Sequence, residues 1–242
     1  MDFDSLRTAR DDIVRDGAPF EAYRRPGDLI DSQHPKIIAY ASGVAGEGSD
    51  QERALRLYYA VRDGLRYDPY NTPMKREAYR ASATFAAGHG YCVNKAGLMA
   101  AACRAVGIAA RVGYADVRNH MTTRRLSELM GSDTFYYHGY TEVWLGGCWV
   151  KATPAFNREL TERFGLRPLD WDGVTDSIYH PFDLAGRRHM EYLAYRGVFA
   201  DIPFDEIRAA FRHYYPRMTR QQEEMPLGGD FGAEGASEAT RK

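Results

Sequence analysis

The chain has 242 residues, 44% of them hydrophobic, and its 32 Lys and Arg against 33 Asp and Glu give a formal net charge of -1. Such a chain can bury one sizeable core, and its balanced, dispersed charge excludes an electrostatic footprint for nucleic acid or an anionic membrane. Three cysteines are too few for a disulfide framework. Residues 1–7 lack the basic and apolar regions that would predict export, and no apolar run approaches the roughly 18 residues of a membrane span. We therefore expect a cytoplasmic protein with free thiols.

The first helical signals precede the main body of the chain. Residues 1–50 are interpreted as an N-terminal arm and helices that pack on the core, with a turn at 24–27. Ser49 to Glu52 is typical of a capped helix start, and apolar residues then recur at three- and four-residue spacings up to Leu65. A loop and a short helix over 76–79 lead on to the next motif.

The most informative stretch is Gly88-His89-Gly90-Tyr91-Cys92, which runs into an Ala-rich helix that stops at Gly107. The glycines place Cys92 in the first turn, where free N–H groups and the helix dipole favour a thiolate. Cys103, three turns further along, is interpreted as a small buried hydrophobe. His89 and Cys92 have the spacing of two metal ligands, but no further ligands lie nearby, so we predict neither a metal site nor a cofactor.

After Gly107 the apolar pattern changes to period two, which predicts a strand from Ile108 to about Val117, followed by a polar excursion over 118–135. A Gly-Gly pair at 146–147 predicts a hairpin between 138–145 and 148–154, with 145 paired to 148. In that register Thr153 lies opposite Tyr140 and diagonal to His138. Further on, helical signals at 187–196 and 205–213 are expected to cover the sheet, and the Gly- and Glu-rich tail over 221–242 is expected to be disordered.

A cysteine at a helix start followed by a histidine at a strand start is the order required for a thiolate-imidazolium pair. In such a pair Cys92 attacks a carbonyl carbon and His138 returns the proton to the leaving group. His120 is a second candidate base, although an exposed loop histidine is its alternative role.

These residues resemble the transglutaminase-like superfamily, whose fold is papain-like. Gly88–Cys92 matches its nucleophile segment, residues 104–111 match the Arg-Ala-x-Gly-Ile-x-Ala-Arg stretch that follows, and residues 138–143 match the histidine segment. The resemblance covers about residues 55–157, and the flanks resemble small stand-alone bacterial members. It implies an α+β fold in which the nucleophile helix packs on an antiparallel sheet, with a catalytic domain over 51–220.

The chain departs from the family where an Asp-Pro pair usually follows the second hairpin strand to orient the histidine. Here Thr153-Pro154 stands in its place, and a hydroxyl cannot stabilise an imidazolium as a carboxylate does. If the strand ending near 116 pairs with the histidine strand, Asp116 comes close to His138, so we predict Asp116 as the third catalytic member. Asp116→Asn should then reduce turnover sharply without loss of stability. The alternatives are Thr153, Asn157 and Asp172.

The backbone N–H of Cys92 should bind the oxyanion together with one further donor. Tyr67 or Asn71, from the loop before the helix, can supply that donor, and packing or capping within the loop is the alternative role of each.

The implied reaction is cysteine-dependent acyl transfer or hydrolysis through a thioester acyl-enzyme, with a peptide, amide or acyl thioester as substrate. Relatives in natural-product pathways imply an alternative, a Dieckmann-type cyclase or amide synthase that acts on a thioester of an acyl carrier protein. A non-catalytic binding module of the same fold is the alternative from another class. An activated Cys92 should react with iodoacetamide well below pH 8.5.

Overall fold

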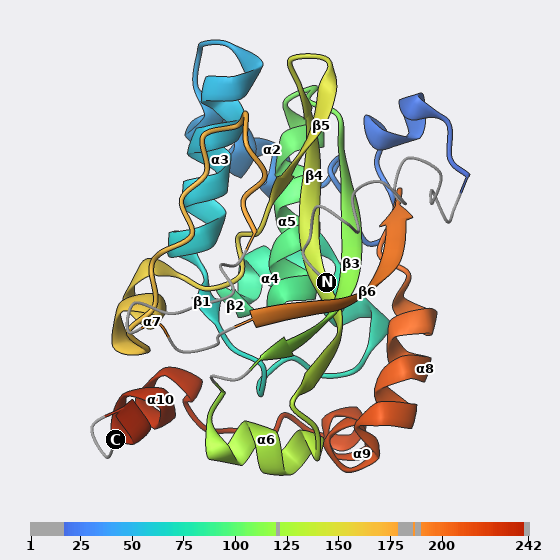
Figure 1. Ribbon diagram of the computed structural model, residues 1–242. Helices are drawn as coiled ribbons and strands as arrows, with labels where there is room; N and C mark the ends of the chain where they lie inside the picture. Colours follow the sequence, from blue (N-terminus) through green and yellow to red (C-terminus); the bar gives the residue numbers. More distant parts are fainter. Residues whose placement is uncertain (1–16, 120–121, 179–185, 187–189, 240–242) are drawn as a thin grey trace.

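The computed structural model describes residues 17–119, 122–178, 186 and 190–239. Its centre is a four-stranded sheet in the order β5-β4-β3-β6, in which every neighbouring pair is antiparallel. The strands are β3 (Ala110–Asn119), β4 (Thr134–Leu145), β5 (Cys148–Ala152) and β6 (Met190–Phe199) (Figure 1). The chain therefore has the α+β class that the sequence predicts.

The hairpin of β4 and β5 has the predicted register, with Leu145 paired to Cys148. Gly146 and Gly147 both have positive φ, 58° and 86°, which a two-residue primed turn requires and which other residues adopt only with strain. The local turn chemistry therefore fixes which side chains of β4 face the core.

Helix α5 (Cys92–Ala105) is the innermost element, with 13 of its 14 residues buried. The sheet packs on one side of it, and α2 (Pro35–Ala45), α3 (Asp50–Gly64) and α4 (Ala81–Ala87) pack around the rest. A helix buried on all sides needs small or apolar residues all round instead of one stripe, which explains its Ala-rich sequence. Cys103 is fully buried, as predicted, and the predicted capping box of Ser49 and Glu52 is present.

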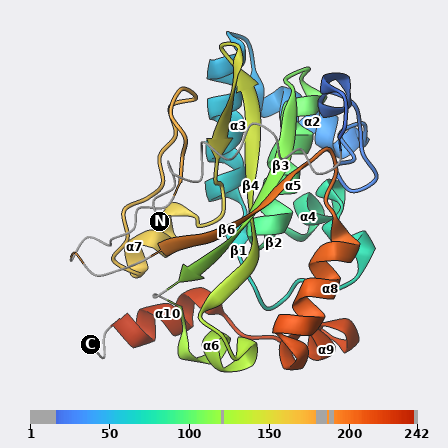
Figure 2. The same ribbon diagram turned by 45° about the vertical axis from the view of Figure 1, so that its right-hand side comes forward.

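The remaining elements surround this centre. They are the 3-10 helices η1 (Phe20–Tyr23) and η2 (Arg76–Tyr79), the short parallel pair β1 (Arg66–Tyr67) and β2 (His89–Gly90), and the helices α6 (Arg124–Met130), α7 (Arg158–Arg163), α8 (Phe204–Tyr214), α9 (Pro216–Glu224) and α10 (Phe231–Ala239). Both views show α6, α9 and α10 gathered at the end of the sheet where α6 links β3 to β4 (Figure 2). None of the described helices combines the length and the apolar character that crossing a bilayer requires.

Two predictions for the C-terminal third are wrong. The segment predicted as a helix over 187–196 contributes, from residue 190 on, the edge strand β6, because its backbone pairs with β3, a distant partner that local helical spacing does not reveal. The tail predicted to be disordered forms the end of α9 and α10. Phe231 anchors α10 there: it is 3% exposed and its ring contacts those of Tyr67, Tyr70 and Phe164.

Candidate active site

Cys92 is the first residue of α5, as the sequence predicts. Tyr91 has an extended backbone at the N-cap and offers no side-chain cap, so the first-turn N–H groups are not capped by it. Gly90 must lack a side chain, because a Cβ there would lie 2.8 Å from Asn94 Cβ. The loop can therefore pass close to the helix and deliver the sulfur to its N-terminus.

The electrostatics of the thiol differ from the prediction. Burial raises the pKa of Cys92 to about 11, while hydrogen bonds from the backbone N–H groups of Gly139, Val93 and Cys92 lower it. Only 5% of the residue is exposed, so desolvation outweighs the helix terminus. In this closed form the thiol is protonated at neutral pH, and the expectation of an acid-shifted cysteine is wrong.

Gly139 brings β4 into contact with this helix terminus. A Cβ at this position would lie 3.0 Å from Val93 Cα and 3.2 Å from Cys92 O. The strand reaches the first turn of α5 only because residue 139 has no side chain. Its neighbour His138 is thereby held beside Cys92.

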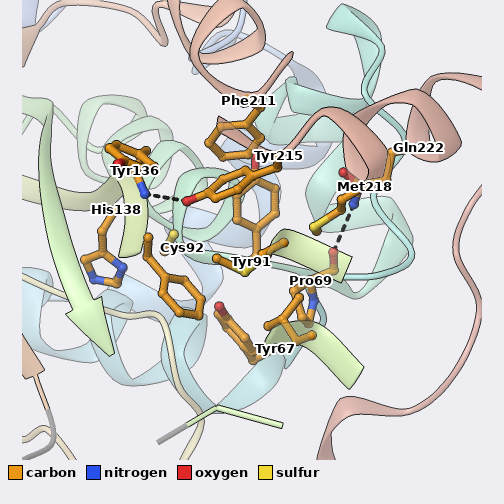
Figure 3. Close-up of a pocket in the computed structure, with 13 residues that line it drawn as sticks. Tyr67, Pro69, Tyr91, Cys92, Tyr136, His138, Phe211, Tyr215, Met218 and Gln222 are labelled. Atoms are coloured by element: carbon orange, nitrogen blue, oxygen red, sulfur yellow. Dashed lines mark hydrogen bonds between the residues drawn. The ribbon is translucent and has the colours of Figure 1, made fainter. Parts of the chain in front are cut away.

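His138 lies in β4, is 4% exposed, and lines the same cavity as Cys92. Figure 3 shows the two side chains on one side of that cavity. The structure therefore brings together the cysteine and the histidine that the sequence pairs. His120, the second candidate base, lies outside the described residues.

Asp116 has a different role from the predicted one. Ala115 is the residue paired with His138, and the register shifts between Ala115 and Val117, so Asp116 lies in a bulge. Its carboxylate accepts hydrogen bonds from Arg196 Nε at 2.9 and 3.0 Å and from the Tyr137 N–H at 3.2 Å. The donors that the structure gives this carboxylate are thus the guanidinium of Arg196 and the backbone N–H of Tyr137, and the imidazole of His138 is not among them.

This contact holds an unusual backbone next to the histidine. Tyr137 has φ 55°, and it is the only residue other than glycine with positive φ in the described part of the chain. The hydrogen bond to Asp116 raises the pKa of Arg196 above its ordinary value, so the guanidinium stays charged. Asp116 therefore contacts the backbone of Tyr137, the residue directly before His138.

The alternative third members are also engaged elsewhere. Thr153 is buried and donates its hydroxyl hydrogen to Ser177 O at 2.7 Å. Asn157 accepts the Tyr67 N–H at 3.3 Å. Asp172 is exposed and accepts the N–H groups of its own turn, led by that of Thr175, which lowers its pKa.

The two predicted oxyanion donors are separated by the structure. Tyr67 lines the cavity with Cys92. Asn71 does not: its amide donates to Asp68 Oδ2 at 2.8 Å and to Gly229 O at 3.4 Å, so the capping role is the correct one. Within the described ranges, no three His, Cys, Asp or Glu side chains are grouped as metal ligands would be.

The walls of the cavity come from segments that the sequence analysis did not connect with the site. Leu126 and Met130 of α6, Phe211 of α8, Tyr215 at the junction, and Met218 and Gln222 of α9 line it. A signal was present, because residues 204, 207, 211, 215, 218 and 222 recur at spacings of three and four and are all buried. That stripe predicts one continuous inward face for α8 and α9.

The helix that begins at Cys92 packs against an antiparallel sheet that carries His138, which is the α+β arrangement that the resemblance implies. The family model of the transglutaminase-like superfamily matches residues 38–154, the stretch that holds both Cys92 and His138. Residues 38–154 are therefore similar to the transglutaminase-like superfamily. Among curated proteins, none matches the chain.

Two solved structures are similar at a low level. A candidate cysteine protease from Cytophaga hutchinsonii has 20% identity and a TM-score of 0.44 over 80% of this chain and 59% of its own. A candidate protease from Parabacteroides distasonis has 15% identity and a TM-score of 0.38 over 55% of this chain and 26% of its own. The chain thus spans less than two thirds of either protein, and likeness at this level carries nothing about activity.

Proposed function

We propose that this protein is a cysteine-dependent enzyme that transfers or hydrolyses acyl groups. The observation that carries the proposal is the placement of Cys92 and His138 in one cavity, where the backbone N–H groups of Gly139, Val93 and Cys92 lower the pKa of the thiol. Those donors stabilise negative charge on sulfur when the proton leaves, which a purely structural cysteine does not need.

The reaction begins from the neutral thiol, because burial keeps it protonated. As the sulfur attacks an amide or thioester carbonyl carbon, His138 takes the proton of Cys92. The bond to the leaving group then breaks, His138 returns the proton to the departing amine or thiol, and the acyl group remains on sulfur as a thioester. Water or an amine releases it in a second attack.

The test is intact-mass spectrometry after incubation with N-acetylcysteamine thioesters and peptide amides. All variants carry Cys148→Ser, since the exposed Cys148 thiol can exchange with thioesters without catalysis. An acyl adduct on the Cys148→Ser protein that is lost with Cys92→Ala supports the proposal. His138→Gln should slow adduct formation by about 10² to 10⁴.

The buried, high-pKa thiol specifically favours one alternative, a binding module that holds acyl compounds without reaction. In that case no acyl compound would leave a mass adduct. Acyl compounds would then raise the melting temperature of the Cys92→Ala protein as much as that of the protein that retains Cys92. That outcome would replace the catalytic proposal.

A further inference from the structure

Gln222 is a polar residue among those that line the cavity. The residue is 3% exposed, and its side-chain Nε2 donates to Pro69 O at 3.0 Å. This bond fixes the orientation of the amide, since a flipped amide would place two acceptors against each other. Gln222 Oε1 must therefore be a hydrogen-bond acceptor, and among the described residues no donor reaches it.

A buried acceptor without a donor is rare in folded proteins, because the free energy of its lost hydration is not recovered. Two hydroxyl groups of the cavity lining already have hydrogen-bond partners. Tyr215 donates to Thr134 O at 2.7 Å and accepts the Tyr136 N–H at 2.6 Å, and the Tyr91 hydroxyl lies 2.8 Å from that of Tyr79. Gln222 Oε1 is thus a buried acceptor, on a residue that lines the cavity, to which a ligand can supply the missing donor.

The chemistry of the walls limits what the ligand can be. Phe211, Met218, Leu126 and Met130 surround the space, and no Asp, Glu, Lys or Arg is among the described residues that line it. A charged group would be desolvated there without a counter-ion. The cavity is about 40 Å³, so a ligand held in this closed form is compact.

The positions of the Cys92–His138 pair and of Gln222 indicate how a ligand would be oriented in the cavity. Figure 3 shows Cys92 and His138 on one side of the cavity and Gln222 with Pro69 on the other. Of the two halves of a substrate, the acyl half stays bonded to sulfur after the leaving group departs. The acyl half is therefore the part that must remain next to Cys92, in the space that Gln222 closes.

We propose that this cavity is the acyl-group subsite, and that it selects an uncharged, compact apolar acyl group with a hydroxyl or N–H donor at its far end, bound by Gln222 Oε1. The inference rests on the proposed acyl chemistry and names its donor class. In the step concerned, a thioester C–S bond breaks and a bond from the same carbonyl carbon to Cys92 Sγ forms. The leaving thiolate takes the proton that His138 removed from Cys92.

The experiment compares N-acetylcysteamine thioesters of unbranched acyl chains of increasing length, each with and without a terminal hydroxyl. Acylation rates are measured by quenched intact-mass spectrometry of the Cys148→Ser protein. At the one length that reaches Gln222, the hydroxylated thioester should react about tenfold faster than its plain partner. At shorter lengths the two should react equally.

Two variants distinguish the loss of the Gln222 Oε1 acceptor from a general disturbance of α9. Gln222→Met should abolish the hydroxyl preference and retain acylation by plain thioesters. Gln221→Met, which changes the exposed neighbour on the same helix, should keep the preference. If Gln222→Met does not fold, the comparison of plain and hydroxylated thioesters on the Cys148→Ser protein still tests the proposal.

The outcomes are distinguishable from failure of the proposed function. Adducts that form with no hydroxyl preference at any length would overturn the subsite while leaving acyl chemistry intact, as would a preference that survives in Gln222→Met. Absence of any adduct with every thioester would overturn the proposed function and this inference together.

Discussion

Replacement of Asp116 distinguishes a residue that positions the histidine from one that holds its charge. In Asp116→Asn, one oxygen can still accept the Tyr137 N–H, whereas the new NH₂ group faces the guanidinium donors of Arg196. The ion pair is lost while the backbone contact beside His138 survives. The Asp116 side chain is 5% exposed and that of Arg196 is 27% exposed, so the loss in unfolding free energy should be about 1 to 2 kcal/mol.

The expected kinetic result follows from which contact is kept. Asp116→Asn should acylate within about tenfold of the unsubstituted protein and with the same pH profile. Asp116→Ala also removes the acceptor of the Tyr137 N–H, which adds about 1 to 3 kcal/mol of destabilisation. It frees the strained backbone before His138, so acylation should slow by about a hundredfold.

The measurements are acylation rate by quenched intact mass and unfolding free energy by urea titration, on Asp116→Asn and Asp116→Ala in parallel. A rate loss of about 10⁴ in Asp116→Asn with unchanged stability would refute this reasoning. That pattern belongs to a carboxylate that stabilises the imidazolium directly.

Three further results are expected. Burial lowers the pKa of Lys95 from 10.5 to about 7, so between these pH values Lys95 binds a proton in the unfolded chain but not in the folded one. Urea titrations should therefore show the unfolding free energy rising across about pH 7 to 10 relative to Lys95→Met. A parallel pH dependence in the two proteins would contradict this. Gly139→Ala should reduce both acylation and stability, because its Cβ would lie 3.0 Å from the α5 backbone, whereas Gly43→Ala, with open space around it, should leave acylation unchanged and serve as the control. Peptide mapping after iodoacetamide treatment at neutral pH should find Cys92 labelled more slowly than the exposed Cys148, and faster labelling of Cys92 would show that the closed form does not persist in solution.

The parts of the site that follow from local chemistry were predictable. The glycines before Cys92 and the Gly-Gly turn at 146–147 each act within a few residues, so the helix start and the hairpin register follow from the sequence. His138 is then placed by alternation along its strand.

The remaining parts depend on partners far apart in the chain. The role of Asp116 depends on a bulge and on Arg196, 80 residues away, and a single register shift reverses which face a strand residue occupies. The pKa of Cys92 depends on how completely it is covered, whereas the helix terminus that predicted a thiolate is only the local part of its environment. Edge strand β6 likewise exists because β3 offers it a backbone to pair with.

The cavity is assembled from two stretches of chain with separate tasks. Cys92 and His138 lie within residues 38–154, whereas Phe211, Met218 and Gln222 lie beyond them, on α8 and α9. Substitutions along the inward face of α8 and α9 should therefore change the cavity wall without changing Cys92 or His138. Under the proposed function, the wall formed by α8 and α9 is the part to exchange or randomise in order to redirect the protein to a new substrate.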